Sequence, residues 1–232
     1  MREELSAFGD VVTVAPETEQ SATSHSLSLH RPLRLREVEP GLFALDGTPA
    51  DCVYVALNSQ QRILPRTPDV VISGINLGLN LGQDVFYSGT VAAAREGALR
   101  GLRALAVSAH TAAPQKPIGQ LAGKIALAMM HRPKVAALTL LNLNVPAQWN
   151  GSVRVTRLGE RLYDQGIDFR TDPRGREYLW IGGPGGVRHD PAPGTDTDAY
   201  DEGVASLTPL VLDLSAHAGE TLAQNLLDSL EL

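Results

Sequence analysis

The stretch from Asp69 to Leu102 constrains the fold of this chain more than any other part of the sequence. It opens with the β-branched run Val70 to Ile72, which is too short for a helix and predicts a strand buried on both faces. A loop rich in Gly and Asn follows from Ser73 to Gly82, and the Ala-rich segment Val91 to Leu102 then predicts a helix. This succession is typical of an open α/β sheet, which binds its ligands at the carboxyl ends of the strands.

Small polar residues stand directly in front of the predicted helix. Ser88, Gly89 and Thr90 precede it, and a helix N-terminus presents unpaired N–H groups and a positive dipole end. We therefore predict that these three residues form a cradle for a phosphate. The Gly-rich loop adds the amide side chains of Asn76 and Asn80, with Asn80 as a further substrate-binding residue.

Other segments of residues 1–150 continue an alternation of strands and helices. The patterns predict a helix from Glu3 to Phe8, a strand from Val11 to Ala15, surface strands within Leu27 to Leu45, a helix from Ala50 to Leu57 capped by Thr48, strands at Ala104 to Ser108 and Ala137 to Val145, and a helix from Ile118 to Met130. The sequence therefore predicts an α/β fold with a doubly wound, mostly parallel sheet.

Residues 151–210 have a different, β-rich pattern. They contain strand-like segments at Val153 to Leu158, Glu177 to Ile181 and Val204 to Leu210, with turn signals at 172–175 and throughout 182–198. We expect one domain of 232 residues with this stretch as a hairpin-rich extension that reaches a neighbouring subunit. In the tail 211–232, leucines at helical spacing form an apolar stripe that packs either on the parent domain or in a dimer contact: Leu222, Leu226, Leu227 and Leu230.

Composition excludes several classes of partner. The formal net charge of −6 disfavours nucleic-acid polymers and anionic membranes. The single cysteine, Cys52, rules out an internal disulfide and fits the cytoplasm, and it is interpreted as a core residue because no histidine neighbours it. No apolar run reaches the length of a membrane span, and the first residues do not resemble a signal peptide.

Motif searches narrow the chemistry further. The chain has no phosphate-binding loop of the GxxxxGK[ST] type, no GxGxxG dinucleotide fingerprint and no GxSxG elbow, which makes Ser88 a poor candidate for a hydrolase nucleophile. What survives is an oxygen-rich pocket formed by Ser21, Asn76, Asn80, Ser88 and Thr90. Such donors suit Mg²⁺, Mn²⁺ or Ca²⁺, and Asp84 is either a further ligand or a loop-capping residue.

Six blocks of sequence resemble the stationary-phase survival protein (SurE) family, in the order of that family. They are APETEQSATSHSLSL at 15–29, GTPADCV at 47–53, SGINLGLNLG at 73–82, YSGTVAAAREGAL at 87–99, LNLNVP at 141–146 and VASLTPL at 204–210. The resemblance implies a Rossmann-like core and a metal-dependent phosphatase that acts on nucleoside 5′-monophosphates, and also on 3′-nucleotides and polyphosphate. It further implies a cytoplasmic homodimer or homotetramer that exchanges its carboxyl-terminal elements.

The same resemblance assigns roles to individual residues. One divalent cation per subunit, Mg²⁺ or Mn²⁺, would be held by Ser21 and Asn76, and the phosphate side of the site would be formed by Ser88, Gly89 and Thr90. The catalytic set is therefore Asn76 with those three residues. Family members also carry an Asp-Asp pair after a first central strand, between the strands at Val11 to Ala15 and Val70 to Ser73.

The sequence does not contain that Asp-Asp pair. A helix that starts at residue 2 favours a misassigned start codon or a fragment over an inactive protein. Without the pair, the remaining neutral donors would hold a hydrated cation weakly. The alternative from another class is a non-catalytic, oligomeric nucleotide- or phosphate-binding protein on the same scaffold, whereas a dinucleotide binder is disfavoured by the absent fingerprint.

Overall fold

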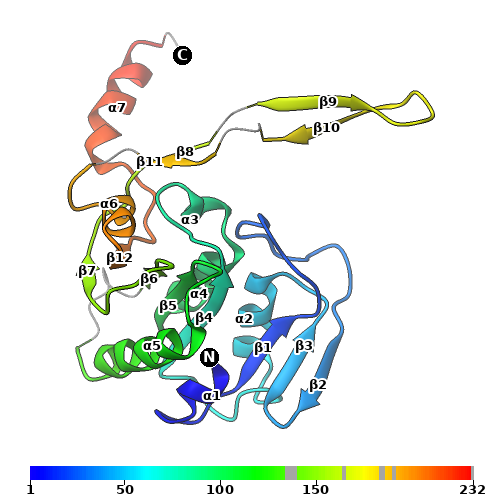
Figure 1. The fold of residues 1–232 in the computed structure, drawn as a ribbon, viewed down its shortest axis with the longest axis vertical. Helices are drawn as coiled ribbons and strands as arrows, with labels where there is room; N and C mark the ends of the chain where they lie inside the picture. Colours follow the sequence, from blue (N-terminus) through cyan, green and yellow to red (C-terminus); the bar gives the residue numbers. More distant parts are fainter. Residues whose placement is uncertain (134–139, 164–165, 183–185, 190–191, 231–232) are drawn as a thin grey trace.

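A five-stranded sheet occupies the centre of the molecule (Figure 1). The computed structural model describes residues 1–133, 140–163, 166–182, 186–189 and 192–230. The strand order is β4-β5-β6-β12-β7, and the strands span Val70–Leu77, Arg103–Ala109, Leu140–Val145, Ala205–Leu210 and Val153–Val155 respectively. β4, β5 and β6 are parallel to one another, while β12 runs antiparallel to β6 and parallel to β7. The predicted α/β fold with a mostly parallel sheet is confirmed.

Helices cover both faces of this sheet because successive side chains of β5 point to opposite sides. Leu105 and Val107 pack in one cluster with α5 (Gln115–Met130). Ala104 and Ala106 pack in another with α4 (Gly89–Leu99). β5 is therefore buried from Ala104 to Ala109 and, apart from Ser108, apolar over that range, as expected for a strand with a helix on each face.

A second, three-stranded sheet lies beside the first (Figure 1). Its order is β1-β3-β2, with β1 at Thr13–Pro16, β2 at Leu35–Glu39 and β3 at Leu42–Leu45. Helix α2 (Pro49–Asn58) packs between this sheet and α4. Thr48 caps α2 as predicted, and Asp51 completes a capping box with it.

The remaining helices are short or lie towards the C-terminus. Helix α1 (Arg2–Leu5) packs on α5 and ends before the predicted limit at Phe8, and α3 (Asp84–Tyr87) precedes α4. Helix α6 (Asp196–Asp201) leads into β12, and the 3-10 turn η2 (His217–Gly219) leads into α7 (Glu220–Asp228). None of the helices in the described part of the chain combines the length and the hydropathy that crossing a bilayer would need.

The hairpin β9 (Ile167–Thr171) and β10 (Glu177–Ile181) projects away from the body of the molecule (Figure 1). Its turn lies at Asp172 to Gly175, where the sequence predicts one, and Asp172 accepts hydrogen bonds from the main-chain N–H groups of Arg174 and Arg176. Two short strands, β8 (Arg161–Leu162) and β11 (Arg188–His189), form the base of this projection. The sequence patterns do not reveal β8, β9 or β11.

The structure corrects four of the sequence predictions. β7 and β12 complete the central sheet, so these two strands belong to the core and not to the extension that the sequence predicted. The prediction was wrong here because local patterns identify strands but not the strands with which they pair. β4 extends to Leu77, and Val70 to Ile72 are half-buried because β4 lies at the edge of the described sheet. Helix α6 begins inside the segment predicted as turns. β1 starts two residues later than predicted, and residues 137–139 of the strand predicted before Pro146 lie outside the described residues.

Candidate functional site

The N-terminus of α4 forms the floor of the candidate site. Ser88 is the N-cap residue, and its Oγ accepts a hydrogen bond of 3.1 Å from the main-chain N–H of Val91. The hydroxyl therefore satisfies one of the orphan amides of the first turn and leaves others to face a ligand. Ser88 is 8% exposed and serves as the cap of α4, and its role towards a phosphate stays a prediction.

Asn76 contacts this helix terminus directly. Its side-chain Nδ2 donates a hydrogen bond to the carbonyl oxygen of Gly78 at 2.9 Å, which fixes the orientation of the amide. Its Oδ1 accepts from the Thr90 hydroxyl at 3.3 Å. The end of β4 and the first turn of α4 are therefore joined at two of the predicted site residues.

The loop that carries Ser21 packs against the same helix terminus. Ser24 donates from its main-chain N–H to the carbonyl oxygen of Tyr87 at 3.0 Å. A Cβ added to Gly89 would lie 3.0 Å from Thr23 Oγ1 and 2.9 Å from Pro49 Cγ, so only glycine allows this approach. Ser21 itself is exposed and donates to Glu19 Oε1 at 3.1 Å.

Asn80 belongs to a buried polar network below the loop. Its Nδ2 donates to Ser108 Oγ at 2.7 Å, and its main-chain N–H donates to Asn144 Oδ1 at 2.8 Å. Its carbonyl oxygen accepts from the side chains of both Asn142 and Asn144. The structure thus shows Asn80 as an anchor between the loop and the strands β5 and β6, and its role towards a substrate stays a prediction.

The carboxyl ends of the parallel strands meet beneath this network. Asn76, Ser108 and Asn144 are in register across β4, β5 and β6. These polar side chains lie near the carboxyl ends of the strands. Nearer the amino ends, apolar residues such as Ala104 and Leu140 pack against α4 instead. The candidate site therefore lies at the sheet edge where open α/β sheets bind ligands.

Asp84 has a different role from either of those considered in the sequence analysis. Its carboxylate pairs with the Arg161 guanidinium and accepts a hydrogen bond of 2.6 Å from the Tyr163 hydroxyl. Burial, together with this bond to Asp84, raises the pKa of Tyr163. Asp84 caps neither the loop nor α3, because it is used to tie α3 to β8, a strand that the sequence pattern does not show.

The donor set suits a hard cation only in part. Ser21 and Asn76 offer neutral oxygens of the kind that Mg²⁺ and Mn²⁺ accept. Glu19, which accepts from Ser21, adds an exposed carboxylate to the same loop. Within the described ranges, however, no group of three or more His, Cys, Asp or Glu side chains gathers at one point.

Two further acids were not predicted from the sequence. Glu96 on α4 is buried and lies 2.9 Å from His25 Nε2, which ties the Ser21 loop to the helix, and it also pairs with Arg100 at 2.7 Å. Asp196 at the start of α6 is fully buried and accepts a hydrogen bond from the main-chain N–H of Gly82. Gly82 lies near the end of the Asn loop, which is formed by residues 78–83 between β4 and α3. The cap pattern Thr195-Asp196-Thr197-Asp198 could have indicated α6, but not the contact with Gly82.

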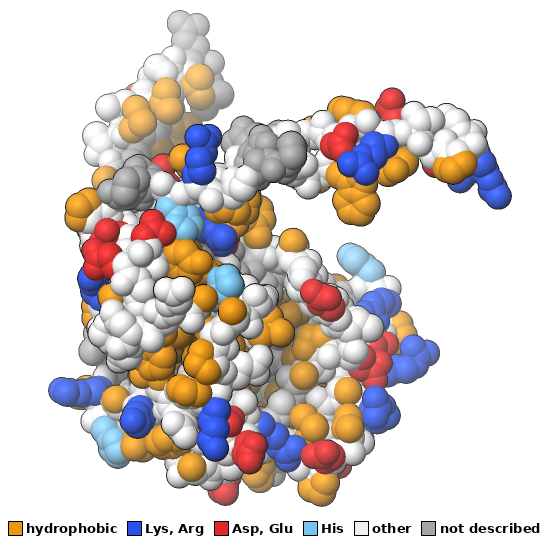
Figure 2. Space-filling view, in the orientation of Figure 1, with side chains coloured by type: hydrophobic (Ala, Val, Ile, Leu, Met, Phe, Trp, Pro, Cys, Tyr) orange, Lys and Arg blue, Asp and Glu red, His pale blue; other side chains and the backbone are white. Residues whose placement is uncertain are grey.

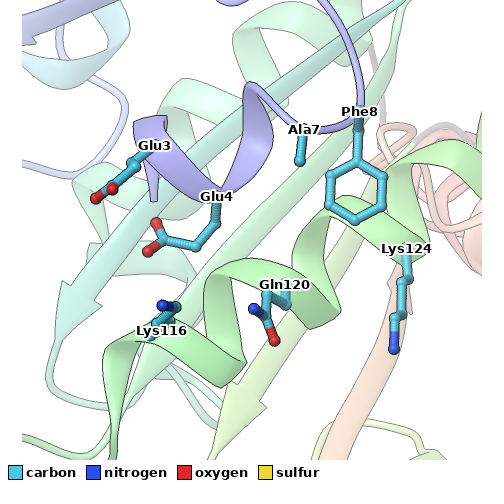
Figure 3. A pocket seen from close by; sticks show the side chains of 7 residues that line it. All are labelled: Glu3, Glu4, Ala7, Phe8, Lys116, Gln120 and Lys124. Atoms are coloured by element: carbon cyan, nitrogen blue, oxygen red, sulfur yellow. The ribbon is translucent and has the colours of Figure 1, made fainter.

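A separate groove lies between α1 and α5 (Figure 3). It is lined by Glu3, Glu4, Ala7, Phe8, Lys116, Gln120 and Lys124, and the close-up shows the acidic side chains on α1 opposite a lysine of α5. None of the predicted site residues lines it. The groove is therefore distinct from the candidate site.

Comparison with known proteins agrees with this geometry. A family model described as "Survival protein SurE" matches residues 1–165. The 5′-nucleotidase SurE of Sorangium cellulosum (strain So ce56) is 58% identical over 227 residues, which cover 96% of this chain and 87% of the relative. The 5′-nucleotidase SurE of Anaeromyxobacter sp. (strain Fw109-5) is 50% identical over 213 residues, covering 90% and 82% respectively.

A solved structure shows the same likeness in three dimensions. The crystal structure of the SurE protein from Aquifex aeolicus superimposes with a TM-score of 0.82 at 33% sequence identity, covering 98% of this chain and 92% of that chain. The family model, the sequence relatives and the fold all agree. The chain therefore belongs to the SurE family.

Proposed function

We propose that this protein is a metal-dependent phosphatase that hydrolyses nucleoside 5′-monophosphates to nucleoside and phosphate, and that it also accepts 3′-nucleotides and polyphosphate. The observation that carries the proposal is the junction of Asn76 with Thr90 at the N-terminus of α4, against which the Ser21 loop packs. Relatives at 58% and 50% identity are 5′-nucleotidases by name, which supports the reaction.

The chain's own residues would bind and orient the phosphate. Main-chain N–H groups of the first turn of α4 donate to its oxygens, as does the Thr90 hydroxyl once it turns from Asn76 Oδ1 to the phosphate, and the helix dipole favours the negative charge. As charge develops on these oxygens during attack by water, the fixed donors stabilise it without reorganising. Catalytic roles are thus proposed for Asn76, Ser88, Gly89 and Thr90.

A divalent cation, Mg²⁺ or Mn²⁺, would be held by Ser21 and Asn76. When bound, it supplies a Lewis acid for a phosphate oxygen and lowers the pKa of a bound water. A tightly held dication also takes carboxylate ligands, and we propose that the Asp-Asp pair implied by the family resemblance supplies them.

Release of phosphate from AMP tests this proposal. We expect turnover with Mn²⁺ or Mg²⁺ that EDTA abolishes, and higher turnover for a version of the chain with an added upstream strand and an Asn-Asp-Asp-Gly loop. Equal activity of the two versions would reject the role of the Asp pair. Activity that persists in EDTA would reject the metal dependence.

One observation favours a second function, a non-catalytic protein that binds nucleotides or phosphate. The donors at the site are mostly neutral, and the described residues bring together no acid cluster. Calorimetry separates the two functions. Binding of AMP that chelators leave unchanged supports the non-catalytic protein, provided that neither the present chain nor its version with the added upstream segment releases phosphate.

We further propose that the protein is a cytoplasmic homodimer or homotetramer. The stripe of leucines on α7 is between 55% and 64% exposed, and the hairpin β9–β10 carries exposed apolar side chains on its flanks. Figure 2 shows both regions as orange patches that project from the body of the molecule. Exposed apolar surface of this extent marks an interaction site, and exchange of these elements between subunits would cover it.

A further inference from the structure

Asp196 is a fully buried acid that the proposed chemistry does not use. Its exposed fraction is 0%, and α6 begins at this residue. No ion pair with a described Lys, Arg or His accompanies it, and its carboxylate oxygens instead accept from main-chain N–H groups. Burial raises its pKa in spite of the hydrogen bonds from Gly82, Gly159 and Thr197. A carboxylate is costly to keep in such a place, so the bonds that it makes are informative.

The carboxylate joins two segments that are far apart in the sequence. Oδ2 accepts from the N–H of Gly82 at 3.0 Å, across 114 residues, and Oδ1 accepts from the N–H of Gly159 at 2.7 Å. Hydrogen bonds to an ionised acceptor are about twice as strong as neutral ones. Asp196 therefore acts as a clamp between the end of the Asn loop and the segment that leads into β8.

Both clamped residues are glycines in places where a side chain would not fit. A Cβ at Gly82 would lie 2.5 Å from the carbonyl oxygen of Gly159, and Gly82 has a φ of +51°. A Cβ at Gly159 would lie 2.2 Å from Thr197 Oγ1. Gly82 therefore packs directly on the backbone of Gly159, Gly159 packs on the threonine side chains at the start of α6, and the Asp196 carboxylate bonds to the N–H groups of both glycines.

Neighbouring bonds extend the same junction. The main-chain N–H of Arg161 donates to Gln83 Oε1 at 3.0 Å, and its guanidinium donates to the carbonyl oxygen of Leu79 at 3.3 Å. Residues 159–161 thus lie along residues 79–83. This stretch carries Asn80 and connects Asn76 with the N-terminus of α4.

We propose that Asp196 is a positioning residue for the candidate site: by clamping Gly82 to Gly159, it holds the Asn loop in the place where Asn76 contacts Thr90 at the N-terminus of α4 and Asn80 bonds to β5 and β6. This inference rests on the proposed function for its kinetic consequence. The clamp itself concerns the conformation of the Asn loop, which can be measured without any turnover.

The test compares Asp196→Asn with Asp198→Asn. In Asp196→Asn the side chain keeps its volume, but one of the two oxygens becomes an NH₂ group. This hydrogen-bond donor would then face the main-chain N–H of Gly82 or Gly159, which is also a donor. Asp198 is the matched control, because it lies on the same helix and bonds to Gly194 and Arg154 instead of the Asn loop. We expect kcat for AMP to fall at least tenfold in Asp196→Asn with KM changed less than threefold, and both values to change less than twofold in Asp198→Asn.

Hydrogen exchange of residues 78–84 supplies a readout that does not depend on activity. We expect it to accelerate at least tenfold in Asp196→Asn only, at a temperature where unfolding curves show both variants folded. Wild-type exchange in Asp196→Asn, or equal acceleration in Asp198→Asn, would overturn the clamp. An accelerated loop, with no AMP hydrolysis by either the present chain or its version with the added upstream segment, would support the clamp and reject the phosphatase.

A second variant covers the case in which Asp196→Asn does not fold. Gln83 is exposed, so Gln83→Ala removes its bond to Arg161 at the same junction without opening the core. A fall in kcat of at least threefold with faster exchange at 78–84 supports the proposal, and unchanged kcat and exchange contradict it.

Discussion

Thr90 occupies the point where the strand end and the helix terminus of the candidate site meet. Its hydroxyl is the atom that links α4 to Asn76, and the main-chain amide of the same residue belongs to the first turn of the helix. Thr90 therefore contacts Asn76 through its hydroxyl, and in the proposed reaction its main-chain N–H, and its hydroxyl once this turns away from Asn76, donate to the phosphate.

Thr90→Val tests this dependence at the residue scale. Valine has nearly the same shape but removes the hydroxyl, and loss of one fixed donor to a developing charge lowers kcat by about tenfold or more. We expect that fall in phosphate release from AMP, with little change in the unfolding midpoint. Thr111→Val, at an exposed turn, is the control. Equal kcat in Thr90→Val and wild type would exclude Thr90 from the reaction.

Helix α2 shows how one element is fixed by its first turn. Asp51 accepts from the main-chain N–H of Thr48 at 2.8 Å and from both the N–H and the hydroxyl of Ser28. Burial alone would raise the pKa of Asp51, but these hydrogen bonds outweigh it and hold the pKa below its ordinary 3.8. The ionised carboxylate therefore stabilises both the helix start and the loop that runs past it.

We expect Asp51→Asn to lower the free energy of unfolding by about 1 to 2 kcal/mol at pH 7. This is the range for the loss of a helix-capping interaction and of hydrogen bonds to a charged acceptor. Because the folded pKa is depressed, the contribution is complete above pH 3.8 and disappears as the pH falls through the folded value. Urea unfolding at pH 7 and near pH 3 measures both effects. A difference between variant and wild type that does not shrink at low pH would contradict this explanation.

At the scale of the whole molecule, the hairpin and α7 are the parts that the body does not cover. In the hairpin, Phe169 faces Leu179 and Ile167 faces Ile181, so one face carries four large apolar side chains, each at least 50% exposed. An isolated two-stranded hairpin is marginally stable in water. Contact with a second copy of the chain, as in the proposed homo-oligomer, would cover these side chains and stabilise the hairpin.

We expect the wild type to sediment as a dimer or a tetramer, and Phe169→Ser with Leu179→Ser to shift the mass towards the monomer. The paired change Leu35→Ser with Val38→Ser is the control, because these residues are exposed apolar positions on β2, away from the hairpin. Analytical ultracentrifugation at several concentrations decides. A monomeric wild type, or an unchanged mass in the hairpin variant, would reject the interface.

The sequence by itself determined the elements whose signals are local. The run at Val70 predicted β4, Thr48 and Pro49 predicted the start of α2, and Ser88 predicted the cap of α4. The turn at Asp172 to Gly175 was equally clear. These features depend on residues within about one turn of each other, so their physics can be read without the rest of the chain.

Only the tertiary structure decided which of these elements lie together. β12 joins β6 across some 60 residues, Asp84 pairs with Arg161, and Asp196 reaches Gly82. Each contact depends on how distant segments pack, because a carboxylate in the sequence carries no mark of its partner. Local propensity therefore predicted the start of α4 at Ser88, whereas burial and packing decided which distant residues contact the Asn loop.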